Sequence, residues 1–233
     1  TWGCIPVWGF AEVIMSNNHE IEHGERVFGY FPPANFLVVN PVKVSPASFS
    51  DGKEHRKDLP PVYNNYVRLN AESDYDKSMD DIRALLFPLH ITAFCLCDAL
   101  EEQSYDGASQ VLIVSASSKT AIGLAQGLAE TEESPKIIGI TSSNNLQFVE
   151  SLGCYDQVIS YDDLGSINNV STVMVDMSGN QEVLSAIQDN LKEKLIKCLT
   201  VGMTHWDKGV SVDEALAQAE LQDRTEFFFA PAH

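Results

Sequence analysis

The sequence predicts an α/β fold in which a small β region precedes a doubly wound parallel sheet. After a turn at Asp106 and Gly107, continuous apolar segments such as QVLIVSA (110–116) and KIIGIT (136–141) alternate with segments of helical periodicity. Uninterrupted apolar strands are typical of a parallel sheet whose two faces are both covered by helices. Before that turn, apolar and polar residues alternate and are punctuated by Gly and Pro, which indicates short strands and turns.

Three strands are expected in the first forty residues, at 5–15, 25–31 and 35–40. The next segment, 45–81, is polar and rich in Pro, Asn and Asp, and it is too long for a simple connection in a compact domain. We therefore interpret it as an inserted loop. A helix is predicted at 79–102, because the apolar side chains recur on one broad face, and Pro88 is expected to kink it.

The parallel sheet is expected to alternate strands with helices. Its strands are predicted at 110–116, 136–141, 157–161, 171–177 and 197–203, and its helices at 119–131, 144–152 and 181–192. Gly153 follows the second of these helices, and glycine is typical of helix C-termini. The three phenylalanines at 227–229 are expected to form a further apolar strand.

The composition excludes some classes of partner. The chain has 233 residues, with 15 Lys plus Arg against 33 Asp plus Glu and a net charge of −18. Nucleic acids and anionic membrane surfaces are bound by clustered cations, so this balance argues against both as ligands. No apolar run reaches the ~18 residues of a membrane span, and no membrane span is expected. The length fits one large domain, or one and a half.

The cysteines indicate a reducing compartment. Their number is odd, and their spacing is that of neither a zinc site nor a disulfide framework; they are Cys4, Cys95, Cys97, Cys154 and Cys198. We expect an intracellular protein, with the cytoplasm as the simplest location and an organelle left open. The first residues lack the basic start and the cleavage site of a signal peptide, and we expect the true start of the chain to lie before residue 1.

The turn after the first strand of the parallel sheet is the main candidate for ligand binding. In doubly wound sheets, free backbone N–H groups at this point meet a phosphate. The turn here is SASSKTAIG (115–123), in which Ser118, Thr120 and Gly123 stand where a G-x-G-x-x-G fingerprint has its glycines. Hydroxyls can cap the helix and donate to phosphate, and Lys119 adds a cation. The alternative is a well-capped helix that binds no ligand.

The end of the second strand bears on the choice of dinucleotide. An acidic residue there binds the ribose 2′-hydroxyl of NAD and repels the 2′-phosphate of NADP. The segment 141–145 is TSSNN, which contains no carboxylate, so NADP is permitted and NAD is not specifically favoured. No Lys or Arg follows to hold the extra phosphate. Ser142 and Ser143 are the candidate contacts.

No metal site or hydrolytic triad is predicted. The six histidines show neither an H-x₃-H pattern nor a Cys/His cluster with metal spacing, so we expect no catalytic zinc. The acidic run DYDKSMDD (74–81) lacks the glycine and the terminal glutamate of an EF-hand. We interpret it as a solvated loop.

Several motifs together resemble a known superfamily. They are VWGFAEVI (7–14), HGERVFGYF (23–31), FPLHITAF (87–94), VLIVSASSKTAIGLA (111–125), FVESLGCYDQVISYDD (148–163) and VMVDMSGN (173–180). The chain resembles the medium-chain dehydrogenase/reductase superfamily, and in particular its zinc-free, quinone-reductase-like branch. The glycine-rich loop departs from that pattern, being longer by two residues and poorer in glycine. With VGMTHWD (201–207) and EFFFAPAH (226–233), the chain is also similar to an uncharacterised group known as a domain of unknown function.

The resemblance implies a Rossmann-like doubly wound parallel sheet with a partial GroES-like β domain. The implied domains are a partial GroES-like catalytic domain with an inserted loop at 1–78, a nucleotide-binding domain at 79–223, and the start of a return to the catalytic domain at 224–233. The implied activity is NADP(H)-dependent, zinc-independent reduction of a small enone, quinone or carbonyl. The implied cofactor-binding residues are Ser117, Ser118, Lys119, Thr120, Gly123, Ser142, Ser143 and Tyr161.

Four residues are candidates for catalysis. Tyr30, at the end of a strand, is the first candidate proton donor, and Tyr63 and Tyr66 on the inserted loop are the next. Thr92 matches the threonine of the helix that the superfamily places near the cofactor. Each has an alternative role in packing or in hydrogen bonding to its own backbone.

A rival hypothesis comes from another class of protein. The chain would keep the fold as a non-catalytic pseudo-enzyme, serving as a structural or accessory subunit of a larger assembly, and the substituted glycines would mark a lost cofactor site. For the enzyme, the resemblance implies a homodimer.

Overall fold

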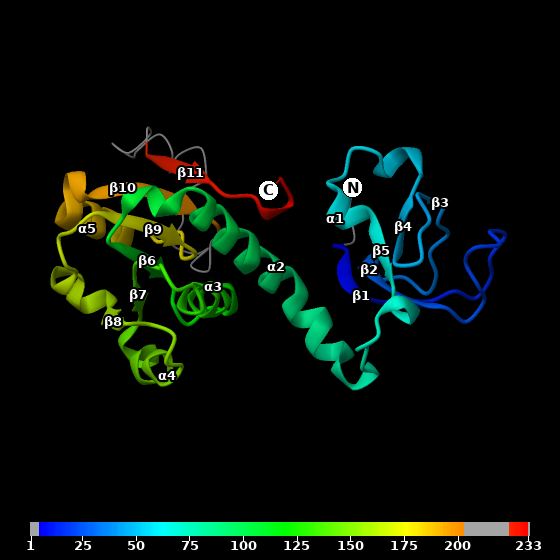
Figure 1. Ribbon diagram of the computed structural model, residues 1–233, viewed down its shortest axis with the longest axis horizontal. Coiled ribbons are helices and arrows are strands. Elements are labelled where there is room, and N and C mark those ends of the chain that lie inside the picture. The colour runs from blue at the N-terminus through cyan, green and yellow to red at the C-terminus, as the bar shows by residue number, and fades with distance from the viewer. Residues whose placement is uncertain (1–4, 203–223, 233) are drawn as a thin grey trace. The chain divides into compact units, whose positions relative to one another are not determined.

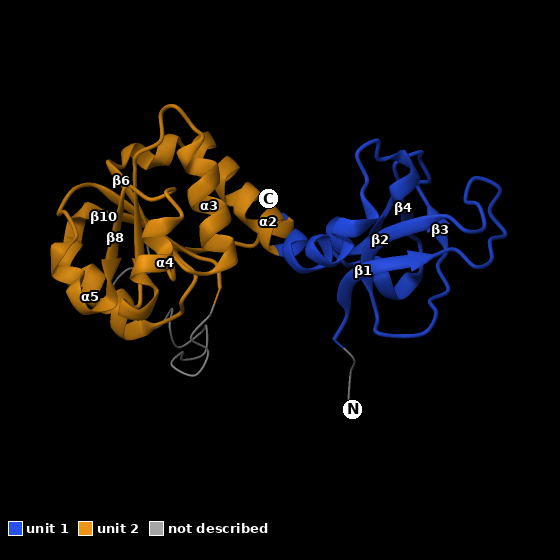
Figure 2. Cartoon of the chain, turned by 90° about the horizontal axis from the view of Figure 1, so that it is seen from below, with its two compact units in different colours: residues 1–88, 232 blue, residues 89–231, 233 orange. Residues whose placement is uncertain are grey.

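The computed structural model describes residues 5–202 and 224–232 (Figure 1). The chain forms two compact units (Figure 2): unit 1 comprises residues 1–88 and 232, and unit 2 comprises residues 89–231 and 233. We predicted a boundary between residues 78 and 79, just before helix α2 (Asp80–Glu102), whereas the two units divide inside that helix, after Pro88.

Unit 1 contains a five-stranded antiparallel sheet in the order β1-β2-β5-β4-β3. Its strands are β1 (Val7–Glu12), β2 (Arg26–Phe31), β3 (Pro41–Val42), β4 (Ser48–Asp51) and β5 (Asn65–Arg68). A short helix, α1 (Pro61–Asn64), lies directly before β5. The buried core of unit 1 contains Ile21, Val27, Phe49 and Tyr66.

The prediction of a strand at 35–40 is wrong. Side chains do alternate there: Phe36 and Val38 are exposed, whereas Leu37 and Val39 pack against the core of unit 1. The segment nevertheless has no strand pairing, and the ladder begins only at β3, which pairs with β4. The alternation therefore reports burial on one side and not membership of the sheet.

The segment that we interpreted as an inserted loop supplies the middle of the sheet. β5 pairs with both β2 and β4, and both of its pairings are antiparallel. Arg68 at the end of β5 donates to the carboxylate of Glu25 and to the backbone oxygens of Ser45 and Glu20. The Glu25 side chain is only 2% exposed. Arg68 thus ties two loops, the β1–β2 connection and the β3–β4 connection, to the sheet.

Unit 2 contains a six-stranded parallel sheet in the order β11-β10-β9-β6-β7-β8. The strands are β6 (Gln110–Val114), β7 (Lys136–Thr141), β8 (Gln157–Ser160), β9 (Thr172–Asp176), β10 (Leu195–Thr200) and β11 (Thr225–Phe227). This is the strand order of dinucleotide-binding folds, with β6 as the first strand. The predicted fold class, a doubly wound parallel sheet with a β domain, is confirmed.

Helices cover both faces of this sheet (Figure 1). Val111 and Ile113 of β6 point to the face covered by α2 and α3 (Lys119–Ala129). Leu112 and Val114 point to the opposite face, which α5 (Gln181–Leu191) covers. The helix α4 (Leu146–Ser151) lies between β7 and β8 in the chain. All five residues of β6 are buried, which explains why this strand reads as an uninterrupted apolar run.

The segment 224–233, expected to begin a return to the other domain, first contributes β11 beside β10. The first described range ends at residue 202. The motif VGMTHWD (201–207) therefore lies outside the described residues from 203 onward, as does residue 203 of the strand predicted at 197–203.

The helical stretch Lys77–Glu102 is long and apolar enough, by length and composition alone, to cross a membrane. Its later part is a core helix of unit 2, because Ala93, Leu96, Ala99 and Leu100 are buried against the sheet and α3. A helix buried in a protein core passes the same test as a membrane span.

Candidate functional site

The carboxyl ends of four parallel strands lie at one edge of the unit 2 sheet. Val114 at the end of β6 pairs with Ile140 of β7 and with Asp176 of β9, and Thr141 of β7 pairs with Ser160 of β8. The chain order reverses at β6, between its neighbours β7 and β9, and ligand crevices of doubly wound sheets form at such a switch point. We call the sheet-edge site the turns 115–118 and 142–145, which follow β6 and β7, together with the segment 160–163 at the end of β8.

The turn from β6 to α3 carries the backbone groups suited to an anion. Ser118 is the N-cap of α3, and its hydroxyl accepts from the backbone N–H of Ala121 at 3.4 Å. The first N–H groups of a helix have no acceptor within it, and the helix dipole makes this end favourable for negative charge. Lys119 is exposed at the first helical position, followed by Thr120. The turn predicted to bind phosphate is thus a capped helix N-terminus with an exposed lysine beside it.

Ser117 joins this turn to the one that follows β7. Its hydroxyl accepts from the Asn145 side-chain amide at 3.1 Å and from the Thr141 hydroxyl at 3.5 Å. Thr141 is buried and Asn145 is half-buried. The two turns are therefore held together by side chains before any ligand is present.

Ser115 and Tyr161 lie at the base of the site. Ser115 has a φ of 65°, a left-handed conformation that is uncommon for residues other than glycine. The Tyr161 side chain is partly buried and packs against the apolar cluster to which Leu112 and Val114 of β6 belong. Burial raises the pKa of Tyr161, and its hydrogen bond to Ser115 lowers that pKa by a smaller amount. The phenol is thus neutral and anchored at the turn.

Tyr155, in the connection between α4 and β8, supports the turn that follows β6. The Tyr155 hydroxyl donates to the backbone oxygen of Ala116 at 2.9 Å. Gly139 makes room for that ring, since a Cβ there would lie 2.9 Å from a Tyr155 ring carbon and 3.0 Å from the Ala116 Cβ.

Gly123 has the packing role of the last glycine in the fingerprint. A Cβ at this position would lie 3.0 Å from the Cβ of Ala93 on α2, and Ala93 is 1% exposed. Gly123 therefore acts through the close approach of α3 to α2. The structure shows no direct role for it toward a ligand.

The turn after β8 contributes a carboxylate that the sequence analysis missed. Ser143, two residues beyond β7, donates from its hydroxyl to Asp162 Oδ2. Ser160 at the end of β8 donates to the same oxygen at 3.2 Å. An acidic residue is expected directly after the second strand, whereas here β8 lies beside β7 and places Asp162 next to the turn that follows β7. The signal was the SYDD segment (160–163) directly after a predicted neighbouring strand.

Two candidate catalytic tyrosines, Tyr30 and Tyr63, lie together in unit 1, whereas Tyr66 is buried in the core of that unit. The ring centroids of Tyr30 on β2 and Tyr63 on α1 are 5.1 Å apart, and the Trp8 ring lies 5.3 Å from Tyr30 and 6.1 Å from Tyr63. All three rings are half-buried. We call Trp8, Tyr30 and Tyr63 the aromatic group. Thr92 is half-buried on α2 and belongs to unit 2.

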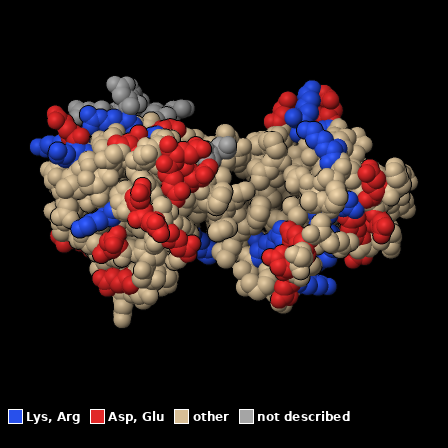
Figure 3. Space-filling model, viewed as in Figure 1, with Lys and Arg blue, Asp and Glu red and all other residues tan. Residues whose placement is uncertain are grey.

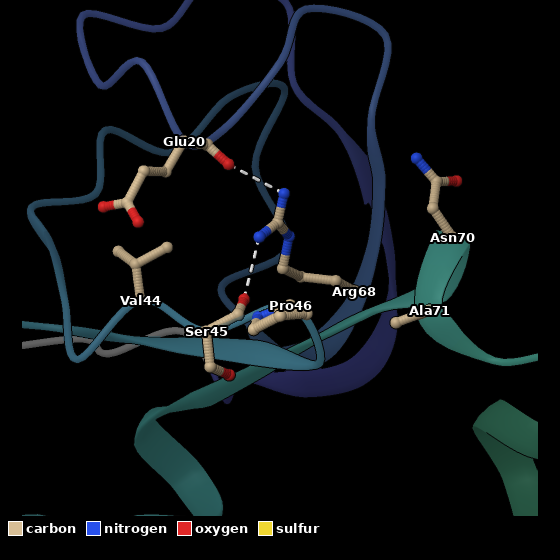
Figure 4. A pocket seen from close by; sticks show the side chains of 7 residues that line it. All are labelled: Glu20, Val44, Ser45, Pro46, Arg68, Asn70 and Ala71. Carbon is tan, nitrogen blue, oxygen red and sulfur yellow. Dashed lines mark hydrogen bonds between the residues drawn. The ribbon is translucent and has the colours of Figure 1, made fainter.

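Unit 1 also contains an open hollow of about 460 Å³ beside Arg68, Ser45 and Glu20 (Figure 4). The Arg68 guanidinium is directed to backbone oxygens, 2.8 Å from those of both Ser45 and Glu20, and to the Glu25 carboxylate. Its hydrogen bond with Glu25 raises the pKa of Arg68. The arginine is therefore committed to the fold, and we assign no ligand to this hollow.

Within residues 5–202 and 224–232, no group of three or more His, Cys, Asp or Glu side chains could hold a metal ion. On the face shown in Figure 3, cationic and anionic side chains are interspersed. An anion at the sheet-edge site would thus depend on amides, hydroxyls and Lys119 more than on a broad positive field.

The two sheets have the fold of several solved oxidoreductases, as the sequence resemblance predicts. A putative NADPH:quinone reductase from Mesorhizobium loti superposes with a TM-score of 0.58 at 13% identity, over 97% of this chain and 60% of that one. The quinone oxidoreductase from Coxiella burnetii superposes with a TM-score of 0.55 at 19% identity, over 95% of this chain and 61% of that one. The yhdH oxidoreductase from Salmonella enterica, solved in complex with NADP, gives 0.53 at 14% identity, over 97% and 64%. At these identities the likeness shows the fold.

The chain belongs to the family described as "Protein of unknown function (DUF2855)", whose model matches residues 1–233. The predicted similarity to an uncharacterised group is thereby confirmed. Protein YIM1-2 from Lachancea thermotolerans is 30% identical over 203 residues, which are 78% of this chain and 50% of that protein. The chain thus spans about half the length of the curated relative that it matches.

Proposed function

We propose that this chain is the dinucleotide-binding part of an NADP(H)-dependent, zinc-independent oxidoreductase that reduces a small enone, quinone or carbonyl compound. The observation that carries the proposal is the sheet-edge site, where a capped helix N-terminus stands at the switch point of a six-stranded parallel sheet. Structural neighbours with this fold include an oxidoreductase in complex with NADP, which supports the choice of cofactor.

The residues of the site fit the pyrophosphate of a dinucleotide. Ser118 and Thr120 replace two glycines of the fingerprint, so the cradle offers hydroxyl donors in addition to the amides of α3. Lys119 would lie beside the negative charge. Ser142 and Ser143 would face the ribose at the end of β7, and Tyr161 would lie at that end of the sheet-edge site.

When bound, the reduced dinucleotide would supply a hydride to the acceptor. The part played by unit 1 would be to hold a flat acceptor and to exclude water from it. The aromatic group suits this, because half-buried rings offer apolar faces for stacking. Tyr30 or Tyr63 would donate a proton from its phenol to the reduced acceptor. Thr92 would help to position the cofactor.

The test is NADPH oxidation by the purified full-length protein with a quinone or an enone as acceptor. We expect turnover that persists after treatment with a metal chelator. The double variant Tyr30→Phe/Tyr63→Phe keeps the rings and removes both hydroxyls, so we expect lower kcat with little change in KM. A protein that binds NADPH but reduces none of these acceptors would contradict the proposed activity.

A specific observation favours the rival, a non-catalytic subunit. The hydroxyls of Ser117 and Ser118 already have partners within the protein, namely Asn145, Thr141 and the helix backbone. A turn stabilised in this way can persist without a ligand. The rival predicts no saturable NADPH binding, together with co-purification in a complex with other proteins.

We also propose a homodimer in the cytoplasm for the oxidoreductase. Sedimentation of the full-length protein and fractionation of the source cells test these two points. A monomer, or a protein found only inside an organelle, would contradict them.

A further inference from the structure

The turns that follow β7 and β8 carry an acidic group where the proposed cofactor's adenosine ribose would lie. In dinucleotide-binding sheets, the group at the end of the second strand contacts the ribose 2′ position. Here the second strand is β7, and Ser143 stands two residues beyond its end. The Ser143 hydroxyl is bonded to the carboxylate of Asp162. The position that a 2′-phosphate would approach is therefore already next to a negative charge.

The local hydrogen bonds fix this carboxylate in place. Asp162 Oδ2 accepts from Ser143 and, at 3.2 Å, from Ser160. The backbone N–H of Asp162 also donates to the Ser160 hydroxyl at 3.2 Å. Thr141 and Ser160 are paired across β7 and β8, so the sheet itself sets the separation of the two turns. An acid held in this way acts on a ligand without first having to be ordered.

No cation on these turns offsets that charge. The segments TSSNNLQ (141–147) and SYDDLGS (160–166) contain no Lys, Arg or His. The basic residue of the site, Lys119, lies at the start of α3, where the pyrophosphate is expected. A 2′-phosphate brings about two further negative charges to a place with an acid and no base. A free 2′-hydroxyl, in contrast, can donate to that acid.

We propose that Asp162 is a specificity-determining residue that opposes the 2′-phosphate, so that this protein binds NADH and NADPH with similar affinities. The inference rests on the proposed function and adds to it. Asp162 takes the role of the acidic residue that other sheets place directly after the second strand, but it acts from the neighbouring strand β8. The site then accepts both reduced dinucleotides.

The experiment compares the dissociation constants of NADPH and NADH for the full-length protein and two variants, measured by titration calorimetry. Asp162→Asn keeps the shape and an acceptor oxygen but removes the charge. Asp163→Asn is the matched control, since it makes the same change in charge one residue further along the same exposed turn. We expect wild-type constants within about 10-fold of each other. We expect Asp162→Asn to strengthen NADPH binding about 10-fold and to change NADH binding by less than about 3-fold. At about 5 Å in water, the charge of Asp162 and the two charges of a 2′-phosphate repel each other by about 1.7 kcal/mol, which is of this order.

The outcomes separate this inference from the proposed function. If the ratio of the NADPH and NADH dissociation constants is unchanged in Asp162→Asn, or changes equally in Asp163→Asn, the role of Asp162 is refuted while dinucleotide binding stands. If the wild type binds neither dinucleotide, both proposals fail. The ratio should also move toward that of Asp162→Asn when salt is added to the wild type, because an exposed charge is screened. A ratio independent of salt would count against an electrostatic role.

Discussion

Replacement of Gly123 by alanine tests whether close packing of two helices is what this position requires. A Cβ at residue 123 would lie 3.0 Å from the Ala93 Cβ, and neither group can rotate away. Overpacking of this kind costs about 1–3 kcal/mol, whereas alanine is better than glycine in a helix by about 1 kcal/mol. We therefore expect Gly123→Ala to lower the free energy of unfolding by about 1 kcal/mol.

The assay is urea denaturation under reducing conditions, arranged as a double-mutant cycle with Ala93→Gly. In the Ala93→Gly background the clash is absent, so the same Gly123→Ala change should stabilise the protein by about 1 kcal/mol. Gly165→Ala is the control, because a Cβ there meets nothing within 4 Å, and it should change stability by less than about 0.5 kcal/mol. A Gly123→Ala variant that is more stable than wild type, with no coupling to residue 93, would refute the reasoning.

Three further predictions concern the cap, the buried ion pair and a thiol. Ser118→Ala should lower the free energy of unfolding by about 1 kcal/mol through loss of the cap, whereas Ser118→Asp should keep the cap and weaken NADPH binding; equal affinities for the two variants, in calorimetry, would argue against an anion at this turn. Glu25→Leu should cost about 3 kcal/mol, because it leaves the largely enclosed Arg68, whose side chain is 15% exposed, without its carboxylate, and adding Arg68→Met should recover part of that loss; a Glu25→Leu protein with wild-type stability in urea would contradict the assignment. Burial raises the pKa of the Cys97 thiol to about 11, so the folded state keeps a neutral thiol that the unfolded chain ionises near pH 9. Stability should then be fully present below pH 9 and decline as the pH rises toward 11. Linkage of the full shift gives a loss of about 2 kcal/mol, and because the thiol is only partly buried we expect about half of that. Cys97→Ala should make the alkaline decline shallower; identical pH profiles would show that this thiol is not responsible.

The parallel sheet could be predicted from the sequence because its strands are buried on both faces. All five residues of β6 are inaccessible to solvent, and such a strand reads as a continuous apolar run. The sheet of unit 1 was harder to predict. β5 (NYVR) and β4 (SFSD) have mixed composition, so the polar segment 45–81 gave no periodic signal although it contains two central strands.

The parts of the site that depend on local sequence could be predicted, whereas the parts that depend on which strands are neighbours could not. Ser118 could be recognised as a cap from its place before an apolar helix. Asp162 could not be linked to Ser143 by spacing alone, because their contact requires β7 and β8 to be adjacent and in register. The same holds for Tyr155, whose hydroxyl reaches the Ala116 backbone 39 residues earlier. Contacts between neighbouring turns of a sheet are set by register, which a single sequence does not display.

The most direct test of the central claim is the titration of the full-length protein with NADPH, followed by nicotinamide fluorescence and by thermal unfolding. The sheet-edge site predicts saturable binding that Lys119→Ala weakens. It also predicts a gain of about 2.7 kcal/mol in the free energy of unfolding at a cofactor concentration of 100 times Kd. No saturable binding up to millimolar NADPH, with unchanged unfolding, would contradict a dinucleotide site at this edge of the sheet.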